Sequence, residues 1–211
     1  MNSNLISGLY AVTPDELNID LLCQKVEAAL QGGAAIVQYR NKAADASMRL
    51  RQASALLALC RSYHVPFIIN NHLDLCAQLD ADGLHLGAAD GNVGEARRVL
   101  GADKIIGASC YNQLDLALKA EAAGASYVAF GACFSSGSKP NAVNAPLALF
   151  AQAKNKISIP LVAIGGITLA NAPQVVKAGA DALAVIAALF DSAEITKTSQ
   201  QFVQMFHADD R

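Results

Sequence analysis

Short apolar runs alternate with longer amphipathic stretches along the chain. Eight of these runs have the length and hydrophobicity of parallel strands that are buried on both faces. They are Leu9–Val12, Ala35–Tyr39, Phe67–Ile69, Gly83–Leu86, Lys104–Gly107, Tyr127–Phe130, Leu161–Ile164 and Ala182–Ile186. Stretches with helical spacing of apolar residues lie between them, such as Leu21–Leu30, Ser47–Tyr63, Leu114–Ala123, Leu147–Lys154 and Ala172–Ala178. The pattern predicts eight strand–helix units.

A glycine or an acidic turn leads into several of the predicted strands. These turns are Gly32-Gly33, Asp82-Gly83, Gly124-Ala125 and Gly179-Ala180-Asp181. Glycine at a helix end adopts the left-handed conformation that stops the helix. Eight such units in 211 residues predict an α/β fold, a single (β/α)8 TIM barrel over residues 1–211, with an open doubly wound sheet as the alternative.

Composition narrows the kinds of partner that the chain can have. Hydrophobic residues make up 53% of the sequence and the net charge is −2, so there is no basic field for nucleic acid or an anionic membrane. The first residues lack a basic segment followed by an apolar run, and no later run is long enough to cross a bilayer. We therefore expect a soluble, cytoplasmic protein that binds small molecules, and its apolar composition suggests a homodimer.

Polar residues gather where the predicted strands end. In a barrel of this kind the carboxyl ends of the strands form the mouth, where reactive residues stand. Gln38, Arg40 and Lys42 alternate along the second strand and its end, so they should point the same way while the strand continues. Two cations and an amide suit a diphosphate, whereas ordinary solvation of a strand end is the alternative. Further polar groups at strand tips are Asn70, Asn71, Asp90 and Ser109.

Two other segments could hold an anion. The loop after the sixth strand carries Ser136, Ser138 and Lys139, and hydroxyls, turn N–H groups and an ammonium can surround phosphate oxygens. A solvated surface loop would have a similar composition. After the seventh strand, Gly165-Gly166 lets main-chain N–H groups approach a ligand, and Thr168 to Asn171 is expected to open a helix. Ile186-Ala187 could add N–H groups after the eighth strand.

Several motifs in order resemble the thiamine-phosphate synthase family, and the likeness runs along nearly the whole chain. The motifs are Gly8-Leu9-Tyr10-Ala11-Val12-Thr13, Val37-Gln38-Tyr39-Arg40-Asn41-Lys42, Ala81-Asp82-Gly83-Leu84-His85-Leu86-Gly87, Ile106-Gly107-Ala108-Ser109-Cys110-Tyr111-Asn112, Ser136-Gly137-Ser138-Lys139 and Val162-Ala163-Ile164-Gly165-Gly166-Ile167. The resemblance implies a transferase that joins 4-amino-5-hydroxymethyl-2-methylpyrimidine diphosphate to hydroxyethylthiazole phosphate. The implied products are thiamine phosphate and pyrophosphate.

The resemblance also implies Mg²⁺ as the cofactor and a dissociative reaction in which pyrophosphate leaves a pyrimidine carbocation. Its catalytic residues would be Arg40, Lys42, Lys139 and Ser109. Metal ligands would be Asp90 and Asn71. Contacts with the phosphorylated substrates would come from Gln38, Arg40, Lys42, Asn70, Ser109, Ser136, Ser138, Lys139, Gly165, Gly166, Ile186 and Ala187.

One departure from the family pattern bears on the metal. Asn71 stands where the family usually has an aspartate, and an amide offers Mg²⁺ a single neutral oxygen. Asp90 keeps the family's other carboxylate. We therefore expect weaker magnesium binding and leave two alternatives open. They are an isomerase of the thiazole-tautomerase kind, which needs no metal, and a non-catalytic protein that binds thiazole or thiamine phosphate.

Overall fold

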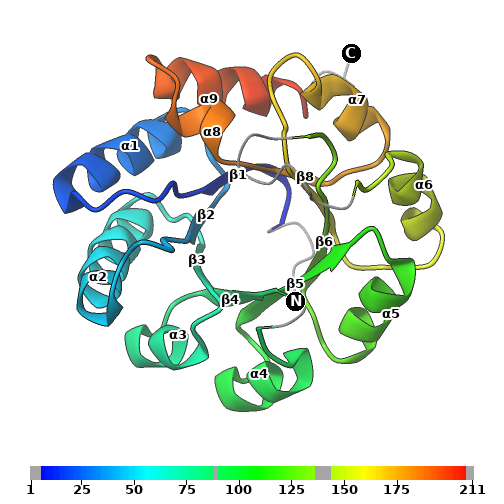
Figure 1. The fold of residues 1–211 in the computed structure, drawn as a ribbon, viewed down its shortest axis with the longest axis horizontal. Coiled ribbons are helices and arrows are strands. Elements are labelled where there is room, and N and C mark those ends of the chain that lie inside the picture. The colour runs from blue at the N-terminus through cyan, green and yellow to red at the C-terminus, as the bar shows by residue number, and fades with distance from the viewer. Residues whose placement is uncertain (1–5, 88–89, 136–143, 208–211) are drawn as a thin grey trace.

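Eight parallel strands close into a barrel, and helices form a ring around it (Figure 1). The computed structural model describes residues 6–87, 90–135 and 144–207. Each strand pairs with the next, and β8 pairs with β1. The strands are β1 (Gly8–Val12), β2 (Ile36–Tyr39), β3 (Phe67–Asn70), β4 (Gly83–Leu86), β5 (Ile105–Tyr111), β6 (Tyr127–Phe130), β7 (Leu161–Ile164) and β8 (Ala182–Val185). The predicted (β/α)8 barrel is confirmed.

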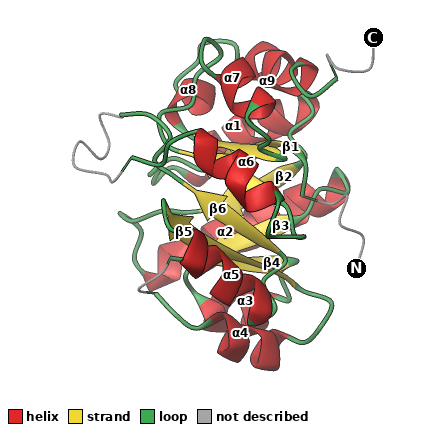
Figure 2. Cartoon of the chain, turned by 90° about the vertical axis from the view of Figure 1, so that its right-hand side faces the viewer, coloured by secondary structure: helices red, strands yellow, loops and turns green. Residues whose placement is uncertain are grey.

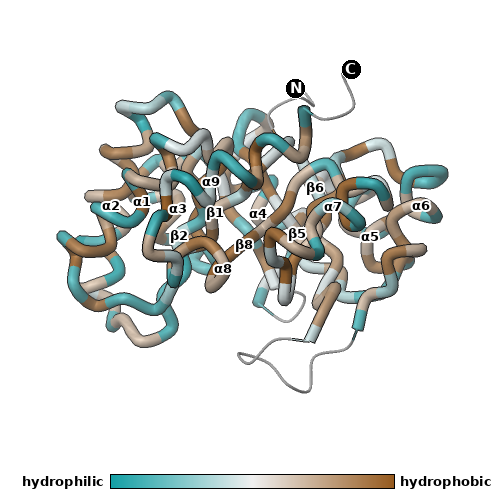
Figure 3. The backbone as a smooth tube through the Cα atoms, turned by 90° about the horizontal axis from the view of Figure 1, so that it is seen from above, coloured by the Kyte–Doolittle hydropathy of each residue, from teal (hydrophilic) through white to brown (hydrophobic). Residues whose placement is uncertain are grey.

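The helices lie outside the barrel and cover its strands (Figure 2). In the described part of the chain they are α1 (Ile19–Gln31), α2 (Ala46–Ser62), α3 (Leu73–Leu79), α4 (Val93–Leu100), α5 (Leu114–Ala122), α6 (Ala148–Lys154), α7 (Ala172–Lys177), α8 (Ala187–Phe190) and α9 (Ile195–Gln204). Hydrophilic residues recur on peripheral helices such as α2 and α6 (Figure 3). No helix within the described ranges has both the length and the hydrophobicity to span a membrane.

Strand residues alternate between two buried clusters, which explains why the strands read as continuous apolar runs. One cluster lies between the strands and the helices. The other fills the barrel, because Tyr10 of β1 and Tyr127 of β6 come from strands that are not neighbours and their rings lie 5.9 Å apart. Gly107 of β5 makes room for the Tyr127 ring, since a Cβ atom at this position would overlap it.

The polar turns before three strands satisfy backbone groups at the amino end of the barrel. Asp82, just before β4, accepts a hydrogen bond from the first N–H of β3 at 2.9 Å. Asp181, before β8, accepts from the first N–H of β7 at 2.7 Å. Ser126, before β6, accepts from the N–H of Ile106 in β5 at 3.0 Å. An unpaired buried N–H is costly, so these side chains stabilise the barrel.

Arg97 of α4 ties together the loops that lead into β5 and β6. The five N–H groups of its guanidinium make six hydrogen bonds, with one Nη1 hydrogen shared between two acceptors. The acceptors are the carbonyls of Gly101, Ala102, Lys104 and Gly124 and the hydroxyl of Ser126. We predict that Arg97→Ala lowers the free energy of unfolding by about 2–3 kcal/mol, because several acceptors lose their donor at once. Urea unfolding measures this, with exposed Arg98→Ala as the control at about 0.5 kcal/mol or less. Equal losses in the two variants would contradict the assigned role.

Most expected boundaries lie within two residues of the observed ones, and two differ by more. Strand β5 was expected to end at Gly107 but continues to Tyr111, and its pairing with β6 shifts register between Ser109 and Tyr111. The segment from Thr168 to Asn171 forms a turn, and α7 begins at Ala172. In that turn the Asn171 side chain accepts from the Thr168 N–H at 2.8 Å and donates to the Gly166 carbonyl at 2.9 Å. Local hydrogen bonds to the asparagine side chain therefore replace the first helical turn.

Candidate active site

The carboxyl ends of β2, β3, β4 and β5 bring several of the expected site residues to one end of the barrel. Strand register pairs Gln38 with Ile68 across β2 and β3, and Asn70 with His85 across β3 and β4. Ser109 lies near the end of β5 and is partly accessible. Gln38 is 5% exposed and lies on the interior face of the barrel, because its amide donates to the Tyr10 hydroxyl at 2.8 Å. The sequence-based grouping of these residues agrees with their placement.

Arg40 is held at the mouth by two residues that follow β1. The Thr13 hydroxyl donates to the Arg40 carbonyl and accepts from the Arg40 N–H, both at 2.8 Å. The Asp15 carboxylate accepts from the Arg40 guanidinium at 3.1 Å and from the Lys42 N–H at 2.7 Å. The Arg40 side chain is 21% exposed. Its position is thus fixed from both the backbone and the side chain, while part of the guanidinium stays accessible to a ligand.

Of Gln38, Arg40 and Lys42, only Gln38 lies within a strand, so the expected alternation of side-chain directions applies to Gln38 alone. Strand β2 ends at Tyr39, so the two cations stand beyond the ladder, and Lys42 is exposed. Hydrogen bonds to the Asp15 carboxylate hold Arg40 and Lys42 in place, and the strand ladder does not. Sequence reasoning missed Thr13 and Asp15 as site residues, although the rule that polar residues follow a strand at the mouth applies to β1 as well.

Oxygen atoms of Asn71 and Asp90 converge beside Gly87 at the end of β4. The Asn71 carbamoyl oxygen accepts from the Gly87 N–H at 3.1 Å. A Cβ atom on Gly87 would overlap the Asp90 carboxylate and would lie 3.8 Å from the Asn71 oxygen, so only glycine leaves this space open. Asn71 has φ of 65°, a left-handed conformation that asparagine and aspartate tolerate better than most residues.

This donor set fits the magnesium ion that the resemblance implies. Mg²⁺ prefers oxygen ligands and usually keeps several waters or substrate phosphate oxygens around one or two protein groups. The described residues contain no cluster of three or more histidine, cysteine or acidic side chains that could hold a metal by themselves. One carboxylate and one amide oxygen therefore suit an ion that shares its coordination with a diphosphate.

Ser109, His85 and Tyr127 have the geometry of a nucleophile, a base and an orienting group. The His85 Nε2 atom lies 2.9 Å from the Ser109 hydroxyl, and its Nδ1 atom lies 2.9 Å from the Tyr127 hydroxyl. Burial lowers the pKa of His85 to about 4, so the imidazole is a weak base at neutral pH. The arrangement favours hydrogen bonding by Ser109 over nucleophilic attack.

The glycines after β7 are required by packing as well as by any ligand. Gly165 and Gly166 have φ of 98° and 62°, and Cβ atoms there would lie 2.6 Å from Ala132 and 2.7 Å from the Phe134 carbonyl. Ile186 follows β8, and Ala187 begins α8. Among the described residues, the N–H groups of Gly166 and Ala187 have no backbone acceptor. Main-chain N–H groups of this kind can bind an anion.

The expected contacts Ser136, Ser138 and Lys139 lie outside the described residues. Their roles stay predictions from the sequence.

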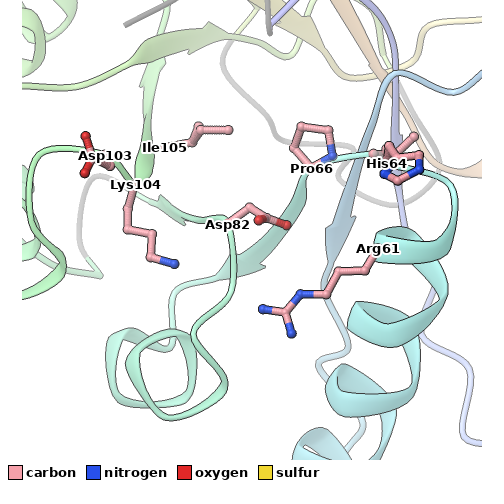
Figure 4. Close-up of a pocket in the computed structure, with 8 residues that line it drawn as sticks. Arg61, His64, Pro66, Asp82, Asp103, Lys104 and Ile105 are labelled. Carbon is pink, nitrogen blue, oxygen red and sulfur yellow. The ribbon is translucent and has the colours of Figure 1, made fainter.

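A cavity of about 490 Å³ lies at the other end of the barrel, beside the amino ends of β3, β4 and β5 (Figure 4). Its lining includes Arg61, Asp82 and Lys104. These charges already have structural partners, because Asp82 accepts from the first N–H of β3 and Lys104 pairs with Asp80 at 2.5 Å. In TIM barrels residues at this end serve stability, so the mouth remains the candidate active site.

Fold and site together define a (β/α)8 barrel whose mouth carries cations and ligand oxygen atoms suited to phosphorylated substrates and a metal ion. The family model described as thiamine monophosphate synthase matches residues 9–189. The chain therefore belongs to the thiamine monophosphate synthase family.

Relatives and a solved structure agree with this assignment. The chain is 54% identical over 202 residues to the thiamine-phosphate synthase of Methylobacillus flagellatus, which covers 96% of both chains. It is 50% identical over 201 residues to that of Nitrosomonas eutropha, with 95% of both chains covered. The thiamine phosphate pyrophosphorylase structure from Pyrococcus furiosus matches with a TM-score of 0.86 and 32% identity, covering 97% of both chains.

Proposed function

We propose that this protein is a thiamine-phosphate synthase. It would join 4-amino-5-hydroxymethyl-2-methylpyrimidine diphosphate (the pyrimidine diphosphate) to hydroxyethylthiazole phosphate (the thiazole phosphate) and release pyrophosphate. The observation that carries the proposal is the mouth itself, where an anchored Arg40 follows β2 and the oxygens of Asn71 and Asp90 converge after β3 and β4. Because these strands are parallel neighbours in the barrel, a cation and a magnesium-type donor set lie at the same end of it.

The cations would stabilise the leaving group. In the reaction the bond between the pyrimidine methylene carbon and the diphosphate oxygen breaks, and its electron pair leaves with pyrophosphate. Arg40 can donate to these oxygens as their charge grows, without reorganising, because Thr13 and Asp15 already hold it. Lys42 follows it on the same loop, and Lys139 would supply a further ammonium.

Asp90 and Asn71 would hold Mg²⁺, which when bound adds positive charge against the leaving pyrophosphate. Asp90 provides the carboxylate, and Asn71 keeps its oxygen directed beside Gly87.

The second substrate then completes the reaction. The lone pair of the thiazole nitrogen forms the new carbon–nitrogen bond with the carbocation, so the protein needs no nucleophile of its own. The thiazole phosphate would be bound by Ser136 and Ser138 and by the backbone at Gly165, Gly166, Ile186 and Ala187, after the last two strands, where TIM barrels often place a phosphate. Gln38, Asn70 and Ser109 would contact the pyrimidine diphosphate from the interior side.

Relatives named thiamine-phosphate synthase favour this function over the two alternatives. A tautomerase-like isomerase carries out no diphosphate chemistry, so it would not need the cations that border the mouth. The single-domain assignment over residues 1–211, the homodimer, the lack of nucleic-acid partners and the cytoplasmic location stay predictions.

Product analysis tests the function. The purified protein is incubated with each substrate alone and with both, and thiamine phosphate and pyrophosphate are quantified. We expect equal amounts of the two products only when both substrates are present. Isomerisation of the thiazole without pyrophosphate release would point to the tautomerase, and stoichiometric binding without turnover would point to the binding protein.

A further inference from the structure

Five polar side chains form a continuous hydrogen-bonded chain through the interior of the barrel. We call it the interior relay, and its links run from Gln38 to Tyr10 at 2.8 Å, to Tyr127 at 2.7 Å, to His85 at 2.9 Å and to Ser109 at 2.9 Å. The five residues come from five different strands. Both ends of the relay are residues that the proposed function assigns to substrate contact, so the inference below rests on that function.

The direction of the relay is set by one amide. The Gln38 Nε2 group donates to the Tyr10 hydroxyl, whose single hydrogen can then go only to Tyr127. Tyr127 in turn donates to Nδ1 of His85. Because a neutral imidazole carries one proton, that proton lies on Nε2 and is donated to the Ser109 hydroxyl.

The order of donors follows from the geometry of the links. Burial raises the pKa values of Tyr10 and Tyr127, so both phenols stay protonated. Tyr127 accepts from Tyr10, and among the described residues its own hydrogen has only the His85 Nδ1 atom as a partner, so this nitrogen is an acceptor.

The two ends of the relay then present opposite groups to the mouth. The Gln38 Nε2 group is used inside the barrel, where it donates to Tyr10, so the side chain can offer a ligand its Oε1 atom. This oxygen has no partner among the described residues. No fully buried side-chain nitrogen or oxygen of the described residues lacks a partner, and Gln38 keeps 5% of its surface exposed. Ser109 accepts from His85, which frees its own hydrogen for a ligand.

We propose that Tyr10, Tyr127 and His85 are positioning residues that fix Gln38 as an acceptor and Ser109 as a donor, and thereby select the amino form of the pyrimidine ring. A 4-aminopyrimidine presents an N–H donor beside a ring-nitrogen acceptor, which complements this pair. A 4-oxo ring presents the reverse, with a carbonyl acceptor beside a ring N–H. Reversing the relay would require rotation of the Gln38 amide and a change of the His85 tautomer together.

Substrate discrimination tests the role in catalysis. The kcat/KM values for the 4-amino pyrimidine diphosphate and its 4-oxo analogue are compared in the natural protein and in Tyr127→Phe. The natural protein should prefer the amino substrate by about 100-fold or more, because the wrong partner leaves both polar groups unpaired. In Tyr127→Phe we expect the preference to fall at least about tenfold, since His85 and Gln38 are no longer coupled, with little change in the KM for thiazole phosphate.

Tyr39→Phe is the matched control. This variant also removes a buried tyrosine hydroxyl, which donates to Gln52 at 2.8 Å and lies outside the relay, whereas Tyr127→Phe removes the hydrogen bonds to Tyr10 and His85. The control should keep the preference of the natural protein. If Tyr127→Phe does not fold, Tyr10→Phe breaks the same relay at its neighbouring link. An unchanged preference in a folded relay variant would overturn the proposal.

The tautomer of His85 tests the direction of the relay without any substrate. Nitrogen NMR of the imidazoles at neutral pH, with the signal assigned by its loss in His85→Gln, should show Nε2 protonated and Nδ1 as an acceptor. An Nδ1-protonated His85 would overturn the proposal even if the synthase activity is present. Absence of synthase activity with the expected tautomer would instead count against the proposed function.

Discussion

Replacing Arg40 with glutamine should lower the kcat for thiamine phosphate formation by about 100- to 1,000-fold, which is the cost of removing one preorganised donor from a developing anion. The loss should appear in kcat because the pyrophosphate oxygens gain charge as the bond breaks. The fold should survive, since Thr13 bonds to the backbone of Arg40 and Asp15 still accepts from the Lys42 N–H.

Steady-state kinetics with both substrates measure this effect, and circular dichroism checks the fold. Arg51→Gln is the control, because Arg51 is an exposed arginine on the outer helix α2 and its side chain contacts Met48 of the same helix. Its kcat should equal that of the natural protein. A fall of less than about threefold in Arg40→Gln, or a change in KM alone, would show that Arg40 does not stabilise the leaving group.

Asp90→Asn should have the second large effect, on magnesium binding. This change removes the carboxylate and leaves two neutral amide oxygens, which are poor ligands for a hard cation. We expect at least a tenfold rise in the Mg²⁺ concentration for half-maximal activity, and a fall in turnover of about 100-fold. Asn71→Asp should act in the opposite direction, since it adds a carboxylate at a position whose left-handed backbone aspartate tolerates.

Calorimetric titration of Mg²⁺ in the presence of inorganic pyrophosphate gives a readout besides activity. Asn71→Asp should bind Mg²⁺ more tightly than the natural protein, and Asp90→Asn should bind it more weakly. Asp74→Asn is the control, because Asp74 is an exposed acid in the first turn of α3, close to Asn71 in sequence. Equal affinities for Asp90→Asn and Asp74→Asn would remove Asp90 from the metal site.

The barrel could be predicted because its signal is local. Each strand is buried on both faces, so its apolar run and the turn before it are visible in the sequence. Ends of strands were harder to place. Strand β5 continues through Ser109 to Tyr111 because its pairing with β6 shifts register, and a register depends on the partner strand as much as on the strand itself.

The site could be predicted only as a set of residues at strand ends. Their connections depend on contacts between distant segments, such as Asp15 with Arg40 across 25 positions and Tyr10 with Tyr127 across 117. Gly107 shows the same limit, since the need for glycine comes from the Tyr127 ring on the next strand. Periodicity identifies which residues face the interior, but it does not show which polar groups meet there.

The rate of thiamine phosphate formation by the natural protein as a function of Mg²⁺ concentration, measured beside Asn71→Asp, tests the central claim most directly. The account predicts magnesium-dependent product with an equal amount of pyrophosphate from the natural protein, and saturation at lower Mg²⁺ in Asn71→Asp. No product from the natural protein at any Mg²⁺ concentration, with activity appearing only when the aspartate is introduced, would contradict the claim that Asp90 and Asn71 form a working site.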